Sequence, residues 1–169
     1  MSAMARAGLG RRLGGLLRAA VRAGRRAPAA GPVRSVEPAP APGDQIGYAP
    51  HPDGVPDPGE VVWAWVPFDE GDGRGKDRPV LVIGRRGGSL LALMLSSKDH
   101  DRDAADEARY GRYWTDIGRG PWDRRGRPSE VRLDRLLVLD PSGVRREGAA
   151  LDRARFDRVV AEARRVQGW

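Results

Sequence analysis

The 169-residue sequence contains no cysteine. It therefore has no disulfide framework, no thiolate metal site and no cysteine nucleophile, which fits a reducing compartment, and we expect a cytoplasmic protein. Its two histidines, His51 and His100, are far apart, and neither lies in a cluster with the spacing of metal ligands. We therefore expect no bound metal and no other cofactor.

The sequence also lacks an apolar segment that could span a membrane, because arginines interrupt the N-terminal apolar residues well short of about 20 positions. Glycine and proline are abundant instead, with 23 and 14 residues, and indicate that part of the chain lies outside a packed core. Residues 27–57 have the composition of a semi-extended linker, rich in Pro, Ala and Gly. We expect residues 1–57 to be a disordered extension and residues 58–169 to form the folded domain.

The formal net charge of +7 is spread unevenly along the chain. Residues 1–34 carry eight arginines and no acid, residues 35–57 carry four acids and no Lys or Arg, and residues 58–169 carry 22 basic against 19 acidic side chains. Most of the excess therefore lies in the N-terminal tail. The overall basicity does not by itself indicate that the folded domain binds nucleic acid.

Within the tail, apolar residues between positions 9 and 21 recur at helical spacing, with arginines mostly on the other side. This pattern predicts a basic amphipathic helix, although three glycines each weaken it by about 1 kcal/mol relative to alanine. We expect the tail to order only when it meets nucleic acid or another anionic surface. An organelle presequence and an inert or wrongly assigned start remain alternatives.

The first strand of the folded domain is expected at residues 61–66 (VVWAWV), which are β-branched, aromatic and followed by Pro67. Residues 68–77 (FDEGDGRGKD) combine three glycines with six charges and predict a mobile, solvated loop. Residues 80–83 (VLVI) and 89–95 (SLLALML) are two further apolar runs on either side of residues 84–88 (GRRGG). This order predicts an antiparallel hairpin whose first strand is covered on both faces.

Antiparallel pairing in that hairpin sets Arg78, at the start of one strand, near Ser96, at the end of the other. A guanidinium presents a planar set of donors that matches phosphate oxygens, and a hydroxyl beside it adds a neutral donor or acceptor. Pro79 restricts the backbone of Arg78 to extended conformations. The pair is therefore suited to hold a phosphodiester.

Four segments occur in order along the folded domain: residues 58–63 (PGEVVW), 78–83 (RPVLVI), 95–98 (LSSK) and 129–136 (SEVRLDRL). In this order and spacing they resemble the PemK/MazF toxins of bacterial toxin-antitoxin systems. The resemblance covers roughly residues 58–169. It implies a mainly β fold, a small SH3-like barrel with a C-terminal helix, usually a homodimer, that cleaves single-stranded RNA without a metal and is neutralised by an antitoxin.

In such proteins the Arg of the Arg-Pro strand start and a Ser or Thr after the next strand form the catalytic pair, and the matching positions here are Arg78 and Ser96. Two departures are a Ser where many members have Thr and a longer, more charged insertion after it. Residues flanking the pair are expected to contact RNA: Lys76, Ser97, Lys98 and His100.

The expected reaction is attack of the RNA 2′-OH on the adjacent phosphate, with Arg78 stabilising the developing charge and Ser96 orienting the phosphate. Arginine stays protonated and is a poor base, so the sequence does not identify the group that accepts the proton. Three nearby side chains are candidates: Asp77, Asp99 and His100.

Residues 107–122 interleave arginines with tyrosines and tryptophans, which suits either base stacking or a short edge strand that closes the barrel. Residues 130–140 (EVRLDRLLVLD) predict one core strand, followed by a turn at residues 140–143. Between residues 151 and 166 an apolar stripe predicts a C-terminal helix that packs on the barrel or on a second subunit.

Two other functions fit the residues. One is a non-catalytic SH3-like barrel that binds nucleic acid or a protein tail, and the other is an adaptor driven by the basic tail, whose barrel only dimerises.

Overall fold

Strand β5 (Ser89–Ser96) is the centre of the fold, and each of its residues is buried. The computed structural model describes residues 33–145 and 149–169. In it, β5 pairs in antiparallel fashion with β4 (Gly75–Arg86), with β8 (Leu136–Leu139) along its first half and with β7 (Ser129–Arg132) at its end. The outer strands extend this sheet: β1 (Val33–Glu37) on β8, β2 (Gln45–Ile46) and β3 (Val61–Pro67) on β4, and β6 (Trp114–Gly118) on β7.

The β4–β5 pairing confirms the predicted hairpin and shortens its turn to two residues, Gly87 and Gly88, because Arg86 already pairs with Ser89. Strand β4 begins at Gly75, inside the predicted loop. A bulge interrupts the register after Val82. At Gly84 a Cβ would collide with the carbonyl oxygen of Gln45, so glycine is what lets β2 lie against β4 there.

Apolar side chains leave the central strands in alternation and fill two clusters, one on each face of the sheet. The first cluster contains Leu81, Ile83, Leu91, Leu93 and Leu95 together with helix residues, and the second contains Val80, Val82, Leu90, Ala92 and Met94. The predicted coverage of both faces is therefore confirmed. Such a strand cannot shift its register without exposing one cluster.

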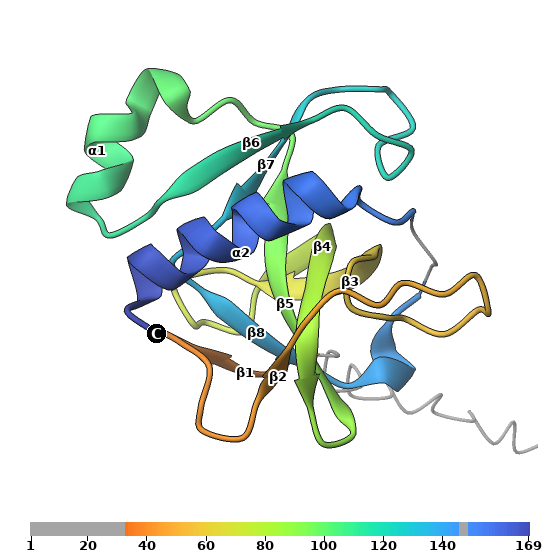
Figure 1. Cartoon of the computed structure of the whole chain (residues 1–169). Helices are drawn as coiled ribbons and strands as arrows, with labels where there is room; N and C mark the ends of the chain where they lie inside the picture. Colours follow the sequence, from red (N-terminus) through yellow and green to blue (C-terminus); the bar gives the residue numbers. More distant parts are fainter. Residues whose placement is uncertain (1–32, 146–148) are drawn as a thin grey trace, which may run out of the picture.

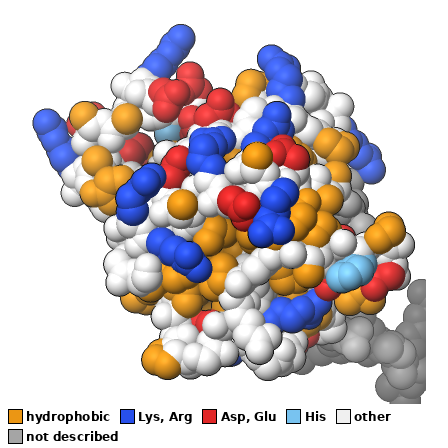
Figure 2. Space-filling model, in the orientation of Figure 1, with side chains coloured by type: hydrophobic (Ala, Val, Ile, Leu, Met, Phe, Trp, Pro, Cys, Tyr) orange, Lys and Arg blue, Asp and Glu red, His pale blue; other side chains and the backbone are white. Residues whose placement is uncertain are grey.

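Helix α2 (Arg153–Gln167) lies across one face of the sheet, as predicted (Figure 1). Its N-cap Asp152 accepts a hydrogen bond from the Arg155 amide, and Gly168 ends it in the left-handed conformation. Its buried stripe packs into the first cluster: Phe156, Val159, Val160 and Ala163. On this face, basic and acidic side chains lie interspersed (Figure 2). None of the helices in the described ranges is long and apolar enough to cross a membrane.

Residues 33–57 differ from the predicted linker. Strand β1 pairs with β8, and Arg86 binds Glu37 and Asp44, with shortest N–O distances of 2.7 Å to each. Further along, the Tyr48 hydroxyl donates to the carbonyl oxygen of Leu151 at 2.8 Å. These contacts reach residues up to 106 positions away, which local composition does not reveal. The predicted amphipathic helix of the tail lies outside the described residues.

Another local prediction also needs correction. The strand expected over residues 130–140 is two strands, β7 and β8, which pair with different parts of β5. The charged insertion after Ser96 contains a 3₁₀ turn (Asp101–Asp103) and a short helix, α1 (Ala104–Arg109). The turn predicted at residues 140–143 is present as a second 3₁₀ turn (Pro141–Gly143), capped by Asp140.

Candidate active site

A groove of about 510 Å³ opens where the ends of β4, β5, β6 and β7 meet the segment that follows β3. Its charged lining consists of six basic side chains, Lys76, Arg78, Lys98, Arg112, Arg132 and Arg135, and three acidic ones, Asp69, Glu70 and Glu107. The groove is therefore net positive although the folded domain is nearly balanced. A positive groove with these donors suits a phosphate backbone.

Arg78 and Ser96 both line this groove. Val80 on β4 pairs with Met94 on β5. Continued by two residues, the same antiparallel register sets Arg78 opposite Ser96, on the same face of the sheet. Both residues therefore lie at the same end of the hairpin and in one groove, and their catalytic roles stay a prediction.

The guanidinium of Arg78 is half-buried and, within the described residues, has no hydrogen bond or ion pair. Burial lowers its pKa, and the positive charge of Arg135 lowers it further, against the opposing effect of Asp69. The charge of Arg78 is thus incompletely compensated. An anion entering the groove would supply the missing partner.

Ser96 is 8% exposed, and its hydroxyl accepts a hydrogen bond from the Lys98 amide at 3.1 Å. This contact fixes the oxygen and leaves the hydroxyl hydrogen free to donate. The side chain can therefore act as a neutral donor next to Arg78.

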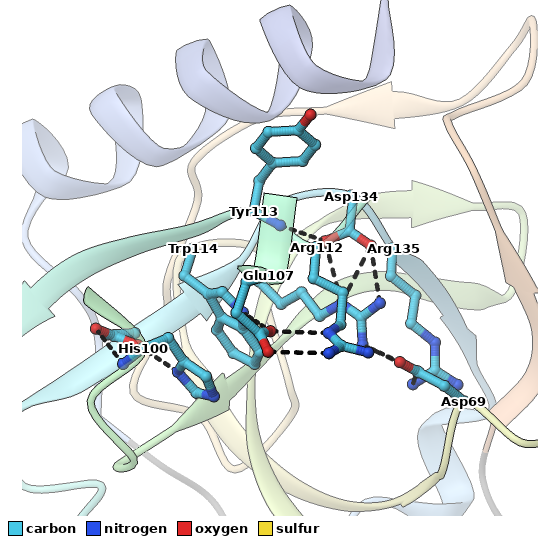
Figure 3. A network of polar contacts seen from close by, with 10 residues as sticks. Asp69, His100, Glu107, Arg112, Tyr113, Trp114, Asp134 and Arg135 are labelled. Atoms are coloured by element: carbon cyan, nitrogen blue, oxygen red, sulfur yellow. Dashed lines mark hydrogen bonds and ion pairs between the residues drawn. The ribbon is translucent and has the colours of Figure 1, made fainter. Parts of the chain in front are cut away.

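Arg132 and Arg135 are buried and share the carboxylate of Asp69. Figure 3 shows Arg135 beside Asp69. The shortest distances to Asp69 are 2.9 Å from Arg132 and 3.0 Å from Arg135, and Arg132 also binds Asp134 at 2.8 Å. Burial opposes the charge of Arg132, but its bonds to Asp134 and Asp69 outweigh that effect and raise its pKa. This cluster holds the back of the groove in a fixed, positively charged arrangement.

Glu107 joins helix α1 to the groove (Figure 3). Its carboxylate accepts two hydrogen bonds from Arg112, at 2.8 and 2.9 Å, and one from the indole of Trp114 at 3.1 Å. The hydrogen bonds from Arg112, followed by that from Trp114, lower the pKa of Glu107 to about 2 against the opposing effect of burial. The insertion after Ser96 is thereby tied to the sheet.

His100 lies beside Trp114, with ring centroids 3.8 Å apart and planes within 3° of parallel (Figure 3). Its Nδ1 is 2.5 Å from Oε2 of Glu130, and its backbone amide donates to the same carboxylate at 3.2 Å. Both side chains are about 10% exposed. His100 lines the groove.

Of the residues expected to contact RNA, Lys76, Lys98 and His100 line the groove, whereas Ser97 is exposed and does not. Lys76 and Lys98 are the two lysines of the whole sequence. Among the candidate bases, Asp77 forms an ion pair with Arg145 and Asp99 is exposed outside the groove. His100 is the candidate that the fold places at the site.

Residues 107–122 combine features of both predicted alternatives. Trp114 begins edge strand β6 and also lines the groove, while Trp122 is buried and donates to the Ser129 hydroxyl at 3.0 Å. Tyr110 and Tyr113 are 74% and 43% exposed. His100 stacks on one face of Trp114, and the guanidinium of Arg132 lies 5.9 Å from its ring centroid.

Sequence reasoning missed the groove roles of Glu107, Arg112, Arg132 and Arg135, and the contact of Glu130 with His100. A usable signal was present at Glu130 and Arg132, which flank the apolar Val131 in a core strand. Charges inside such a strand must be paired or line a site.

In the described residues one group of carboxylates has the spacing of a cation site: Asp99, Asp101 and Glu130. Their oxygen atoms all lie within 4.8 Å of one another. Its buried member is already bound to His100, so we assign no metal to it.

The fold and the groove define a small antiparallel-β protein with a cationic cleft at the end of its central hairpin. Residues 57–166 match the family described as PemK-like, MazF-like toxin of type II toxin-antitoxin system, and the chain belongs to this family. The resemblance seen in the sequence is confirmed. The crystal structure of MazE-MazF (Form-II) from Deinococcus radiodurans is similar, with 23% identity and a TM-score of 0.43 over 69% of this chain and 95% of that chain. No curated protein matches.

Proposed function

We propose that this toxin-family protein is an endoribonuclease that cleaves single-stranded RNA in the groove without a metal. The observation that carries the proposal is the position of Arg78 and Ser96 in one positive groove, with the Arg78 charge incompletely compensated. The family membership supports the same reaction class.

In the proposed reaction the 2′-oxygen attacks the adjacent phosphorus and the 5′-oxygen leaves, which yields a 2′,3′-cyclic phosphate and a 5′-hydroxyl. Arg78 stabilises the charge that accumulates on the phosphate oxygens, and Ser96 donates to one of them. The attacking group belongs to the substrate, so the protein has to position and stabilise rather than supply a nucleophile. The flexible backbone of single-stranded RNA can align the 2′-oxygen with the leaving oxygen, which an A-form helix hinders.

Lys76 and Lys98 flank the pair and are both exposed at the groove. We assign them to neighbouring phosphates, because a lysine binds phosphate as a point charge without a fixed geometry. Ser97 is removed from this RNA-binding set, since it does not line the groove.

The proposed partner is a cognate antitoxin, in keeping with the type II family and with the MazE-MazF complex among similar structures. An antitoxin segment with carboxylates could occupy the groove and compensate Arg78 in place of RNA. A homodimer is the proposed assembly.

The test compares wild type, Arg78→Ala and a control, Arg165→Ala, on end-labelled single-stranded RNA in the presence of a chelator. Arg165 is an exposed arginine of helix α2 and does not line the groove. We expect Arg78→Ala to slow cleavage by about 100- to 1000-fold, the usual effect of removing one charge-stabilising donor, while the control cleaves normally. RNA binding without cleavage by wild type would instead support a non-catalytic binding module.

A further inference from the structure

The ring of His100 is held in one orientation by contacts on two sides. Glu130 accepts at 2.5 Å from Nδ1, and the indole of Trp114 covers one ring face at 3.8 Å between centroids (Figure 3). Trp114 is itself fixed through its hydrogen bond to Glu107. A histidine that only filled space would not need its ring plane and one nitrogen to be fixed separately.

The contact with Glu130 also determines which nitrogen carries the proton. A carboxylate accepts hydrogen bonds, so Nδ1 is the protonated nitrogen and the lone pair of the neutral ring lies on Nε2. This is the arrangement in which a carboxylate orients a histidine that acts through its other nitrogen.

The contacts of Nε2 follow from the hydrogen bonds of His100. In the described residues no side-chain nitrogen or oxygen is both buried and without a hydrogen-bond partner, and Nε2 of His100 has no partner there. It must therefore contact solvent, although the residue is only 8% exposed. The groove is the cavity that His100 lines.

Strand register connects this histidine to the proposed catalytic pair. Ser96 on β5 pairs directly with Glu130 on β7, and Glu130 binds His100. Arg78 lies on β4, which pairs with the other edge of β5, and it lines the same groove as Ser96 and His100.

We propose that Nε2 of His100 is the general base that accepts the 2′-hydroxyl proton, and that Glu130 is the residue that positions it; this rests on the proposed ribonuclease function. As the bond from the 2′-oxygen to phosphorus forms, the proton moves to Nε2. The bond from phosphorus to the 5′-oxygen breaks, and this oxygen takes a proton from water. The resulting hydroxide removes the proton from His100, so no net water is consumed and the base is regenerated.

The test compares wild type, His100→Ala, His100→Gln and the matched control His51→Ala on end-labelled single-stranded RNA. His51 also faces a carboxylate, with Nδ1 3.1 Å from Oδ2 of Asp57, but its side chain is 63% exposed and does not line the groove. We expect normal cleavage by the control. Both His100 variants should cleave about 100- to 10,000-fold more slowly while they bind RNA and unfold cooperatively like wild type.

Two further measurements separate a base from a structural or acidic role. Added imidazole should enter the space vacated in His100→Ala and restore cleavage in proportion to its neutral form. A substrate whose 5′ bridging oxygen is replaced by sulfur should not restore it, since a thiolate leaves without a proton but the 2′-hydroxyl still needs a base. Full recovery on this substrate would overturn the assignment and make His100 the acid.

The positioning role of Glu130 has a spectroscopic test. With two histidines in the sequence, the His51→Ala background leaves one imidazole, whose ¹⁵N shifts report its tautomer. Glu130→Gln should mix the two tautomers and slow cleavage without changing RNA affinity. An unchanged ¹⁵N spectrum would overturn the role of Glu130.

The outcomes for the two proposals can be told apart. If wild type leaves RNA intact, both the ribonuclease function and the role of His100 as its base are overturned. If wild type and both His100 variants cleave equally, the base alone is overturned.

Discussion

Ser96 at the end of β5 pairs directly with Glu130 on β7, so the proposed catalytic hydroxyl and the carboxylate that holds His100 lie side by side on one face of the sheet. The same row continues to Asp116 on β6, which pairs with Glu130. Register, rather than loop conformation, therefore sets the spacing of these groups. A site held by strand pairing is preorganised, because moving one group would require the sheet to slip.

The Ser96 hydroxyl is predicted to matter more than the size of the side chain. Ser96→Ala removes the donor and leaves the Lys98 amide without its acceptor, so cleavage should slow by about 10- to 100-fold, less than for the charged Arg78. Ser96→Thr keeps the hydroxyl and should retain most of the activity. Single-turnover cleavage rates measure both effects. Equal loss in the two variants would show that packing, and not hydrogen bonding, is what Ser96 supplies.

Lys76 and Lys98 should contribute to RNA affinity through charge alone. Each lysine neutralises about one phosphate, so replacing either by alanine should lower the slope of log affinity against log salt by about 0.7 for single-stranded RNA. Fluorescence anisotropy between low and physiological salt measures this slope. The control is Arg165→Ala on helix α2, whose slope should match wild type, and an unchanged slope in both lysine variants would place RNA elsewhere.

The hairpin and the C-terminal helix could be predicted from sequence because their signals are local. The runs at residues 80–83 and 89–95 are apolar at nearly every position, and the stripe of α2 has helical spacing with Asp152 as its cap. Strand β1 gave no such signal. It is short, alternates between exposed and half-buried residues, and depends on pairing with β8 about a hundred residues later.

The site was predictable in part for the same reason. Arg78 and Ser96 belong to one hairpin, so their adjacency follows from a single turn. The contacts of His100 with Glu130, and of Asp69 with Arg132, join residues 30 and 63 positions apart. Such distances depend on which strands become neighbours, and the composition of a charged insertion carries no information about that choice.

Asp69 is predicted to oppose RNA binding while it supports the fold. Asp69→Asn removes the charge shared by Arg132 and Arg135, so the unfolding free energy should fall by about 1–3 kcal/mol. The groove becomes more positive, so RNA affinity at low salt should rise and its salt dependence should steepen. Urea unfolding and anisotropy measure the two effects. Asp72→Asn, an exposed neighbour paired with Arg74, is the control and should change neither.

Glu107 gives a pH-dependent contribution to stability whose sign follows from its pKa. The hydrogen bonds from Arg112 lower that pKa from the ordinary 4.5 to about 2, so the contribution is fully present above pH 4.5 and is lost as the pH falls towards 2. Glu107→Gln should therefore lower the unfolding free energy by about 1 kcal/mol at pH 7, a value reduced by solvent screening. The difference from wild type should shrink below pH 4.5 and vanish near pH 2, as measured by urea unfolding. The control is Asp106→Asn in the same helix, whose pair with Arg109 is exposed and which should show no such pH dependence. If the difference in unfolding free energy between wild type and Glu107→Gln stayed constant with pH, packing rather than charge would be its cause.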